Sequence, residues 1–125
     1  EAAGFPFLGP NCLGVYNPSH ADTFFLPPER MVRPEQGNVA IVSQSGGILV
    51  DLLIKFADEG IGLSVGISIG NKAMIRETHL LDYLAKNPAT EVIAFYVEGF
   101  DKQEGRVFAQ AARACPKPVI VMKAG

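Results

Sequence analysis

Beyond residue 38, short runs of apolar and mostly β-branched residues alternate with polar, Gly- or Pro-containing stretches. Four runs predict buried strands, which are Val39–Val42, Leu63–Ile69, Glu91–Val97 and Val119–Met122. Near-continuous apolar strands are typical of a parallel sheet that is covered on both faces.

Between these strands, apolar residues recur at the three- and four-residue spacing of amphipathic helices. One helix is predicted around Ile48–Phe56, a second at about Glu77–Lys86, and a third that contains Val107 and Phe108 and stops before Pro116. Strands and helices therefore alternate. This order predicts an α/β fold with a doubly wound parallel sheet of about five strands in three αβα layers.

The first 38 residues differ, because they hold six of the nine prolines and show little periodicity. We predict a short strand at Phe5–Leu8 and an ordered loop at Gly9–Gln36 that packs Phe24–Leu26 onto the body. Residues 1–125 are expected to form a single domain of a longer chain, with 1–38 as an irregular N-terminal segment.

Composition narrows the possible partners. The net charge of −2, with scattered Lys and Arg, argues against nucleic acid as a partner. The apolar runs are too short to span a membrane, and no export signal opens the sequence. Cys12 and Cys115 form neither a disulfide framework nor a zinc-ligand spacing. We therefore expect a cytoplasmic setting.

The first strand runs directly into the first helix through Ser43, Gln44, Ser45, Gly46 and Gly47. Small residues let the backbone approach a ligand, and the unpaired N–H groups of a helix start favour an anion. A serine that merely caps the helix explains the same residues equally well. The junction is neither a Walker A loop nor a dinucleotide-binding Gly-x-Gly-x-x-Gly.

Two further strand ends carry polar residues. Gly70 and Asn71 follow the second strand, where they predict a left-handed turn or a ligand contact. Glu98 follows the third strand, where its carboxylate can orient an imidazole, hold a metal, cap a helix or meet solvent. His20 and His79 lie near no nucleophile and at no metal-binding spacing, so neither is assigned a catalytic role.

Five motifs in this order resemble the succinyl-CoA-ligase-like, flavodoxin-like domain of NDP-forming acyl-CoA synthetases, which include the ADP-forming acetate–CoA ligases. They are Gly9–Gly14, Ser43–Gly47, Gly70–Ala73, Tyr96–Gly99, and Lys117-Pro118 with Lys123–Gly125. One departure is Met74-Ile75-Arg76, where many members have acidic residues. Another is that the family's phosphorylated histidine loop has no counterpart in this sequence.

The resemblance implies an enzyme that interconverts acyl-CoA, ADP and phosphate with a small acid, CoA and ATP. It proceeds through an acyl phosphate and a phosphohistidine. It also implies two partners, a CoA-binding Rossmann domain and an ATP-grasp domain or subunit. CoA and ADP or ATP with Mg are then cofactors of the full enzyme, and phosphate binds this domain.

By the same resemblance, Ser43–Gly47 bind phosphate and Glu98 supports the catalytic histidine. Asn11 and Cys12 lie beside the thioester and phosphate region. Gly70 and Asn71 are a possible loop contact, and no metal ligand is implied. Two other hypotheses remain: a metabolite-sensing, non-catalytic copy of the domain in a protein acetyltransferase, and an interaction module without a ligand.

Overall fold

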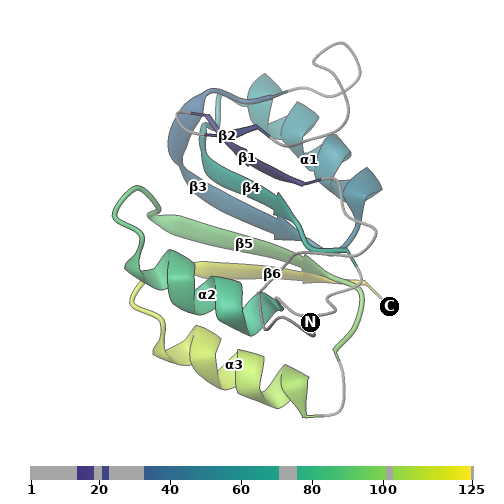
Figure 1. Cartoon of the computed structure of the whole chain (residues 1–125), viewed down its shortest axis with the longest axis vertical. Helices are drawn as coiled ribbons and strands as arrows, with labels where there is room; N and C mark the ends of the chain where they lie inside the picture. The colour runs from purple at the N-terminus through teal and green to yellow at the C-terminus, as the bar shows by residue number, and fades with distance from the viewer. Residues whose placement is uncertain (1–13, 19–20, 23–32, 71–75, 101–102, 125) are drawn as a thin grey trace, which may run out of the picture.

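The computed structural model describes residues 14–18, 21–22, 33–70, 76–100 and 103–124. Within these ranges, six strands form one sheet, and three helices pack against it (Figure 1). The elements beyond residue 35 are β3 (Gln36–Ser43), α1 (Gly46–Asp58), β4 (Leu63–Ser68), α2 (Glu77–Lys86), β5 (Val92–Val97), α3 (Glu104–Ala114) and β6 (Val119–Lys123).

The order of strands in the sheet is β2-β1-β4-β3-β5-β6. The four strands from β4 to β6 are parallel, and β3 lies between β4 and β5. The chain thus moves from β3 outward to β4, returns past β3 to β5, and continues to β6. This arrangement confirms the doubly wound α/β fold and the three helices that the apolar spacing predicted.

Two short strands lie where a loop was expected at Gly9–Gln36, so that expectation is corrected. β1 (Val15–Asn17) pairs antiparallel with β4, and β2 (Ala21–Asp22) pairs antiparallel with β1. Strands of three and two residues are too short to show a period, so no sequence pattern announces them. The predicted strand at Phe5–Leu8 and the packing of Phe24–Leu26 lie outside the described residues.

Tyr16 ties β1 to the chain that leads into β3. Its hydroxyl donates a hydrogen bond of 2.9 Å to the carbonyl oxygen of Pro34. Burial, and then the nearby carboxylate of Asp22, raise the pKa of the Tyr16 phenol above its ordinary value. Asp22 itself is held by the guanidinium of Arg33 at 2.6 Å.

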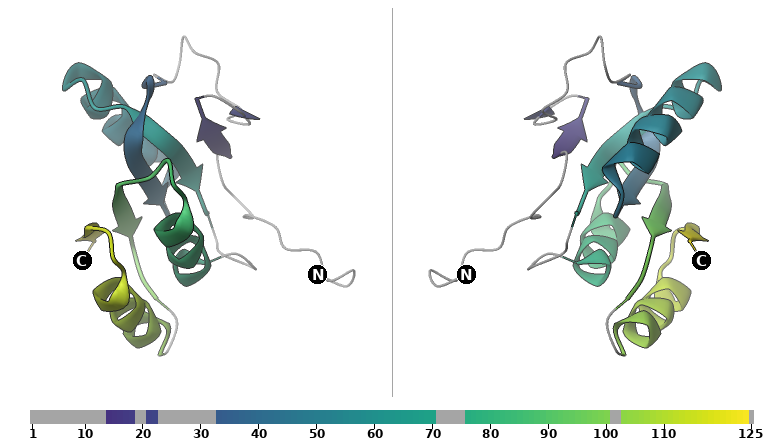
Figure 2. Two further views of the ribbon diagram at one scale, coloured as in Figure 1. Left: turned by 90° about the vertical axis from the view of Figure 1, so that its left-hand side faces the viewer. Right: turned by 90° about the vertical axis from the view of Figure 1, so that its right-hand side faces the viewer.

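The sheet separates two apolar clusters. On one face, Leu49 and Leu53 of α1 pack with Ile41, Leu63 and Ala94. On the other face, α2 and α3 lie side by side and contribute Leu81, Leu84 and Phe108 to a larger cluster (Figures 1 and 2). The ring of Phe108 meets that of Phe95 edge-on, with the centroids 4.9 Å apart. Helices on both faces make the three layers that the sequence predicted.

The amino edge of the sheet depends on a close backbone approach. A Cβ atom added to Gly37 would collide with the backbone of Gly62, and one on Gly62 would lie 2.6 Å from the carbonyl oxygen of Gln36. Only glycine fits where β3 begins beside the turn into β4.

None of the helices in the described part of the chain has the length and hydropathy to cross a membrane.

Candidate functional site

The carboxyl ends of β3 and β5 lie side by side, and the chain leaves them in opposite directions. From β3 it enters α1 on one face of the sheet, and from β5 it enters α3 on the other. A crevice at such a reversal of strand order is where open α/β sheets bind ligands. The structure therefore brings the Ser43–Gly47 junction next to Glu98, although the two are far apart in sequence.

Two serines shape the start of α1. Ser45 is the N-cap residue, and its hydroxyl accepts a hydrogen bond of 3.3 Å from the amide of Ile48. Ser43 is fully buried, and its hydroxyl donates to the carbonyl oxygen of Ser45 at 2.6 Å and accepts from the Ser45 amide at 3.2 Å. Ser45 therefore caps α1, and the hydrogen bonds of Ser43 fix the turn in which Ser45 lies. The amides of Gly46 and Gly47 open the helix and have no partner within it.

Gln44 connects this junction to the end of β5. Its amide donates a hydrogen bond of 3.0 Å to the carbonyl oxygen of Tyr96. Its side-chain oxygen accepts two hydrogen bonds, at 2.8 Å from the amide of Glu98 and at 3.3 Å from the amide of Gly99. The side chain of Gln44 therefore spans the switch point and binds the backbone that carries Glu98.

Lys123, at the end of β6, approaches the same turn from the other side. Its ammonium donates to the carbonyl oxygen of Glu98 at 3.3 Å and to that of Ala124 at 2.8 Å. Lys123 had no predicted role of its own. The available signal was its position, since it closes a parallel strand at the edge where Ser43 and Glu98 also lie. The carboxylate of Glu98 is exposed at this edge.

The remaining predicted residues lie mostly outside the described ranges. Asn11, Cys12, His20 and Asn71 lie outside the described residues, and the roles of Asn11, Cys12 and Asn71 stay predictions. Gly70 is buried and has a φ of 58°, the left-handed conformation expected of a turn glycine.

Arg76 and His79 form the start of α2 at the same edge of the sheet. His79 is exposed on α2, where its Nδ1 accepts a hydrogen bond of 3.1 Å from the amide of Arg76. The guanidinium of Arg76 forms an ion pair of 2.8 Å with Glu104 at the start of α3. Arg76, noted in the sequence as a departure from acidic residues, therefore ties the two helices together.

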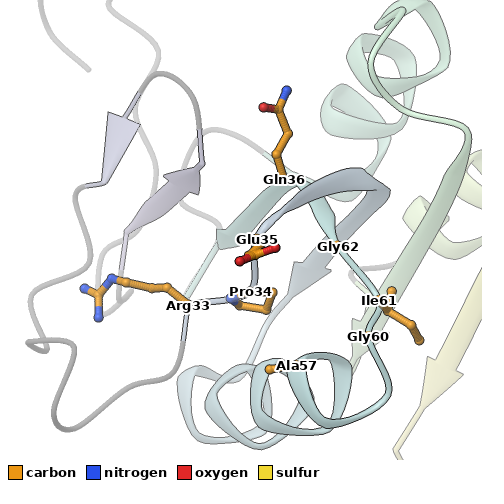
Figure 3. A pocket seen from close by; sticks show the side chains of 8 residues that line it. All are labelled: Arg33, Pro34, Glu35, Gln36, Ala57, Gly60, Ile61 and Gly62. Atoms are coloured by element: carbon orange, nitrogen blue, oxygen red, sulfur yellow. The ribbon is translucent and has the colours of Figure 1, made fainter.

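Other candidate sites are less complete. Among the residues that the structure describes, no three His, Cys, Asp or Glu side chains gather as a metal site. A pocket of about 300 Å³ lies at the opposite, amino edge of the sheet, between the start of β3 and the end of α1. Figure 3 shows that Arg33, Gln36 and Ile61 around it point in different directions. The side chains of Arg33 and Gln36 therefore do not converge on one point of the pocket.

Comparison with known proteins finds relatives along the whole chain. Residues 36–125 match the family model described as succinyl-CoA ligase like flavodoxin domain. The chain is 43% identical over 127 residues to acetate–CoA ligase (ADP-forming) I of Archaeoglobus fulgidus, covering 100% of the chain and 18% of that protein. It is 39% identical to acetate–CoA ligase (ADP-forming) II subunit alpha of Pyrococcus furiosus, covering 98% of the chain and 26% of the subunit.

A solved structure gives the same result in three dimensions. The dinucleotide forming acetyl-coenzyme A synthetase 1 of Candidatus Korarchaeum cryptofilum, in complex with phosphate and ADP, superposes with a TM-score of 0.87 at 38% identity. The superposition covers 99% of this chain and 26% of that one. The chain thus spans roughly a fifth to a quarter of the length of these relatives.

Proposed function

The chain belongs to the family of succinyl-CoA ligase like flavodoxin domains, and on this premise we propose that it is one domain of an NDP-forming acyl-CoA synthetase. The full enzyme would join a small acid to CoA while ATP is converted to ADP and phosphate. The relatives named acetate–CoA ligase (ADP-forming) support this assignment. CoA would be held by a Rossmann domain, and the nucleotide with Mg by an ATP-grasp domain or subunit.

The observation that carries the proposal is the position of the α1 N-terminus beside the Glu98 turn. The amides of Gly46 and Gly47 lie at the positive end of the helix, where an anion is stabilised. The hydroxyl of Ser45 accepts a hydrogen bond from Ile48 and keeps its own proton to donate to a phosphate oxygen. A relative of the same fold was solved in complex with phosphate. We therefore assign Ser45, Gly46 and Gly47 as the phosphate cradle.

Glu98 would act on the histidine that carries the phosphoryl group. A carboxylate beside an imidazole fixes its tautomer and stabilises the imidazolium that remains when the phosphoryl group leaves. We do not assign this role to His79, whose Nδ1 accepts a hydrogen bond from the amide of Arg76 in the first turn of α2. The phosphorylated histidine would come from another segment of the enzyme, so the domain alone would be inactive.

A chimera tests the proposal. Residues 1–125 replace the matching segment of the Archaeoglobus fulgidus ligase, and acetyl-CoA formation from acetate, CoA and ATP is measured. We expect Glu98→Gln to lower kcat at least about a hundredfold, the scale of a lost proton-transfer or imidazole-orienting group. Glu59→Gln, an equally exposed glutamate at the other end of α1, is the matched control. A kcat for Glu98→Gln within twofold of the parent chimera refutes the role of Glu98.

The phosphate cradle is tested on the chain itself, so that the assignment can be refuted even if the chimera is inactive. Inorganic phosphate is titrated into the isotope-labelled chain while the amide signals are followed by NMR. The amides of Gly46 and Gly47 should shift most and saturate together. Phosphate-dependent shifts that concentrate elsewhere on the chain contradict the cradle.

A further inference from the structure

The peptide group between Glu98 and Gly99 is bound at both of its polar ends. Its carbonyl oxygen, which belongs to Glu98, accepts from the ammonium of Lys123 at 3.3 Å. Its N–H, which belongs to Gly99, donates to the side-chain oxygen of Gln44 at 3.3 Å. The preceding N–H, that of Glu98, donates to the same oxygen at 2.8 Å. Two side chains from the neighbouring strand ends therefore hold one peptide plane.

A peptide group that precedes glycine has two accessible orientations, because glycine accepts backbone conformations that other residues avoid. No heavy atom outside its chain neighbours lies within 4 Å of a Cβ built on Gly99, so packing around that atom does not select between them. The Glu98 amide and the Glu98 carbonyl flank the Cα atom that carries the side chain, so holding both groups fixes the direction of the Cα–Cβ bond. Gln44 and Lys123 select one orientation, since each bonds to one end of the plane.

We propose that Gln44 is a positioning residue that, together with Lys123, aims the Glu98 carboxylate, and that it is not a ligand of the phosphate. The two N–H donors fix the amide orientation of Gln44, because only its oxygen can accept from them. That oxygen is therefore occupied by the two amides that follow β5 and does not serve a ligand. As far as it concerns catalysis, this inference rests on the proposed function of Glu98.

The first test measures hydrogen exchange of the Glu98 and Gly99 amides in the chain. Gln44→Met keeps the length of the side chain and removes the acceptor, while Gln44→Glu keeps an acceptor oxygen. Exchange at both amides should be about two- to tenfold faster in Gln44→Met, the factor that one neutral hydrogen bond is worth, and near the parent rate in Gln44→Glu. Gln110→Met, an exposed glutamine on α3, is the matched control. Unchanged exchange in Gln44→Met overturns the proposal.

The second test separates positioning from phosphate binding. The affinity of Gln44→Met for inorganic phosphate should be within about twofold of that of the parent, because the proposal gives the Gln44 side chain no contact with phosphate. A tenfold loss of phosphate affinity without faster exchange would make Gln44 a phosphate ligand and overturn the proposal. Lys123→Met should likewise alter the carbonyl-carbon shift of Glu98, and an unchanged shift excludes Lys123 from the arrangement.

The third test is a double-mutant cycle in the chimeric ligase. Gln44→Met alone should lower kcat about tenfold with KM within about twofold, as expected when a reacting group is misplaced. On a Glu98→Gln background it should lower kcat no further, because both changes act through the same carboxylate. Independent, multiplying effects overturn the proposal. If Glu98→Gln leaves kcat unchanged, the proposed function fails, and the exchange rates still decide whether Gln44 fixes the peptide.

Discussion

Substitutions at Ser45 separate the helix cap from the anion cradle, since they change the two roles in different ways. Ser45→Ala removes the acceptor for the Ile48 amide, a hydrogen bond of 3.3 Å. Loss of such an N-cap costs about 1 kcal/mol, which lowers Tm by roughly 3–6 °C in a domain of this size. Ser45→Asn and Ser45→Asp both restore an N-cap, so their stability should be within about 0.5 kcal/mol of the parent.

The two restored caps differ only in charge, and this difference decides the test. The first turn of α1 contains no acidic residue, so the aspartate meets no like charge within the turn. A carboxylate about 4 Å from a phosphate is repelled by roughly 4 kcal/mol at an effective dielectric constant of about 20, before screening by salt. Phosphate affinity should therefore fall at least about tenfold in Ser45→Asp compared with Ser45→Asn.

Thermal unfolding and phosphate titration by NMR, run in the same low-salt buffer, give both quantities for all four proteins. In Ser45→Asp, the thermal stability should stay near that of the parent while the affinity for phosphate falls. If Ser45→Asp and Ser45→Asn bind phosphate equally well, the anion does not lie at the start of α1. If Ser45→Ala is as stable as the parent, the cap contributes nothing.

Two further predictions concern the frame around the site. The raised pKa of Tyr16 means that folding favours the neutral phenol, so its contribution to stability is complete below about pH 10 and is lost as pH rises through the folded-state pKa. Tyr16→Phe should flatten this alkaline loss of stability, as measured by urea unfolding at a series of pH values. An identical loss in both proteins contradicts the assignment. Gly37→Ala should destabilise the chain by about 1–3 kcal/mol or more, because the new methyl group meets the backbone of Gly62. Gly47→Ala is the control, since its Cβ would have only the Ser45 hydroxyl nearby, at 4.0 Å. Equal urea midpoints for the two variants would contradict the close approach of Gly37 and Gly62.

The sequence predicted the parallel part of the fold well, because its strands are apolar on both faces. Residues 39–42 of β3 form a continuous apolar run, and β4 is buried throughout although Ser and Gly alternate with its apolar residues. The first three residues of β3 are polar or glycine, and the signal there disappears although the strand continues. β1 and β2 were missed for a related reason, because they are defined by pairing, β1 with β4 and β2 with β1, and not by a hydrophobic period.

The structure places the Ser43–Gly47 junction beside Glu98, while the binding and catalytic roles of these residues stay predictions. Chain order alone indicated that Ser43–Gly47 and Glu98 would meet, since both follow strands of one parallel sheet. The contacts of Gln44 were beyond reach, because the groups it binds are 54 and 55 residues away and follow from strand register. The buried hydroxyl of Ser43 looked like a ligand donor for the same reason, since sequence does not show that it turns back onto Ser45.

The double hold on the Glu98–Gly99 peptide also sets the order in which the domain can assemble. Gln44 is separated from Glu98 by 54 residues and Lys123 by 25. The first hydrogen bond cannot form until β3 and β5 are aligned, and the second cannot form until β5 and β6 are aligned. Contacts between such distant residues close after local helices and turns, because the chain entropy of the intervening loops must first be overcome. We therefore expect the turn that presents Glu98 to be among the last parts to become ordered during folding. Nascent or misassembled chains would then lack the geometry to receive a phosphoryl group, even where their helices have already formed.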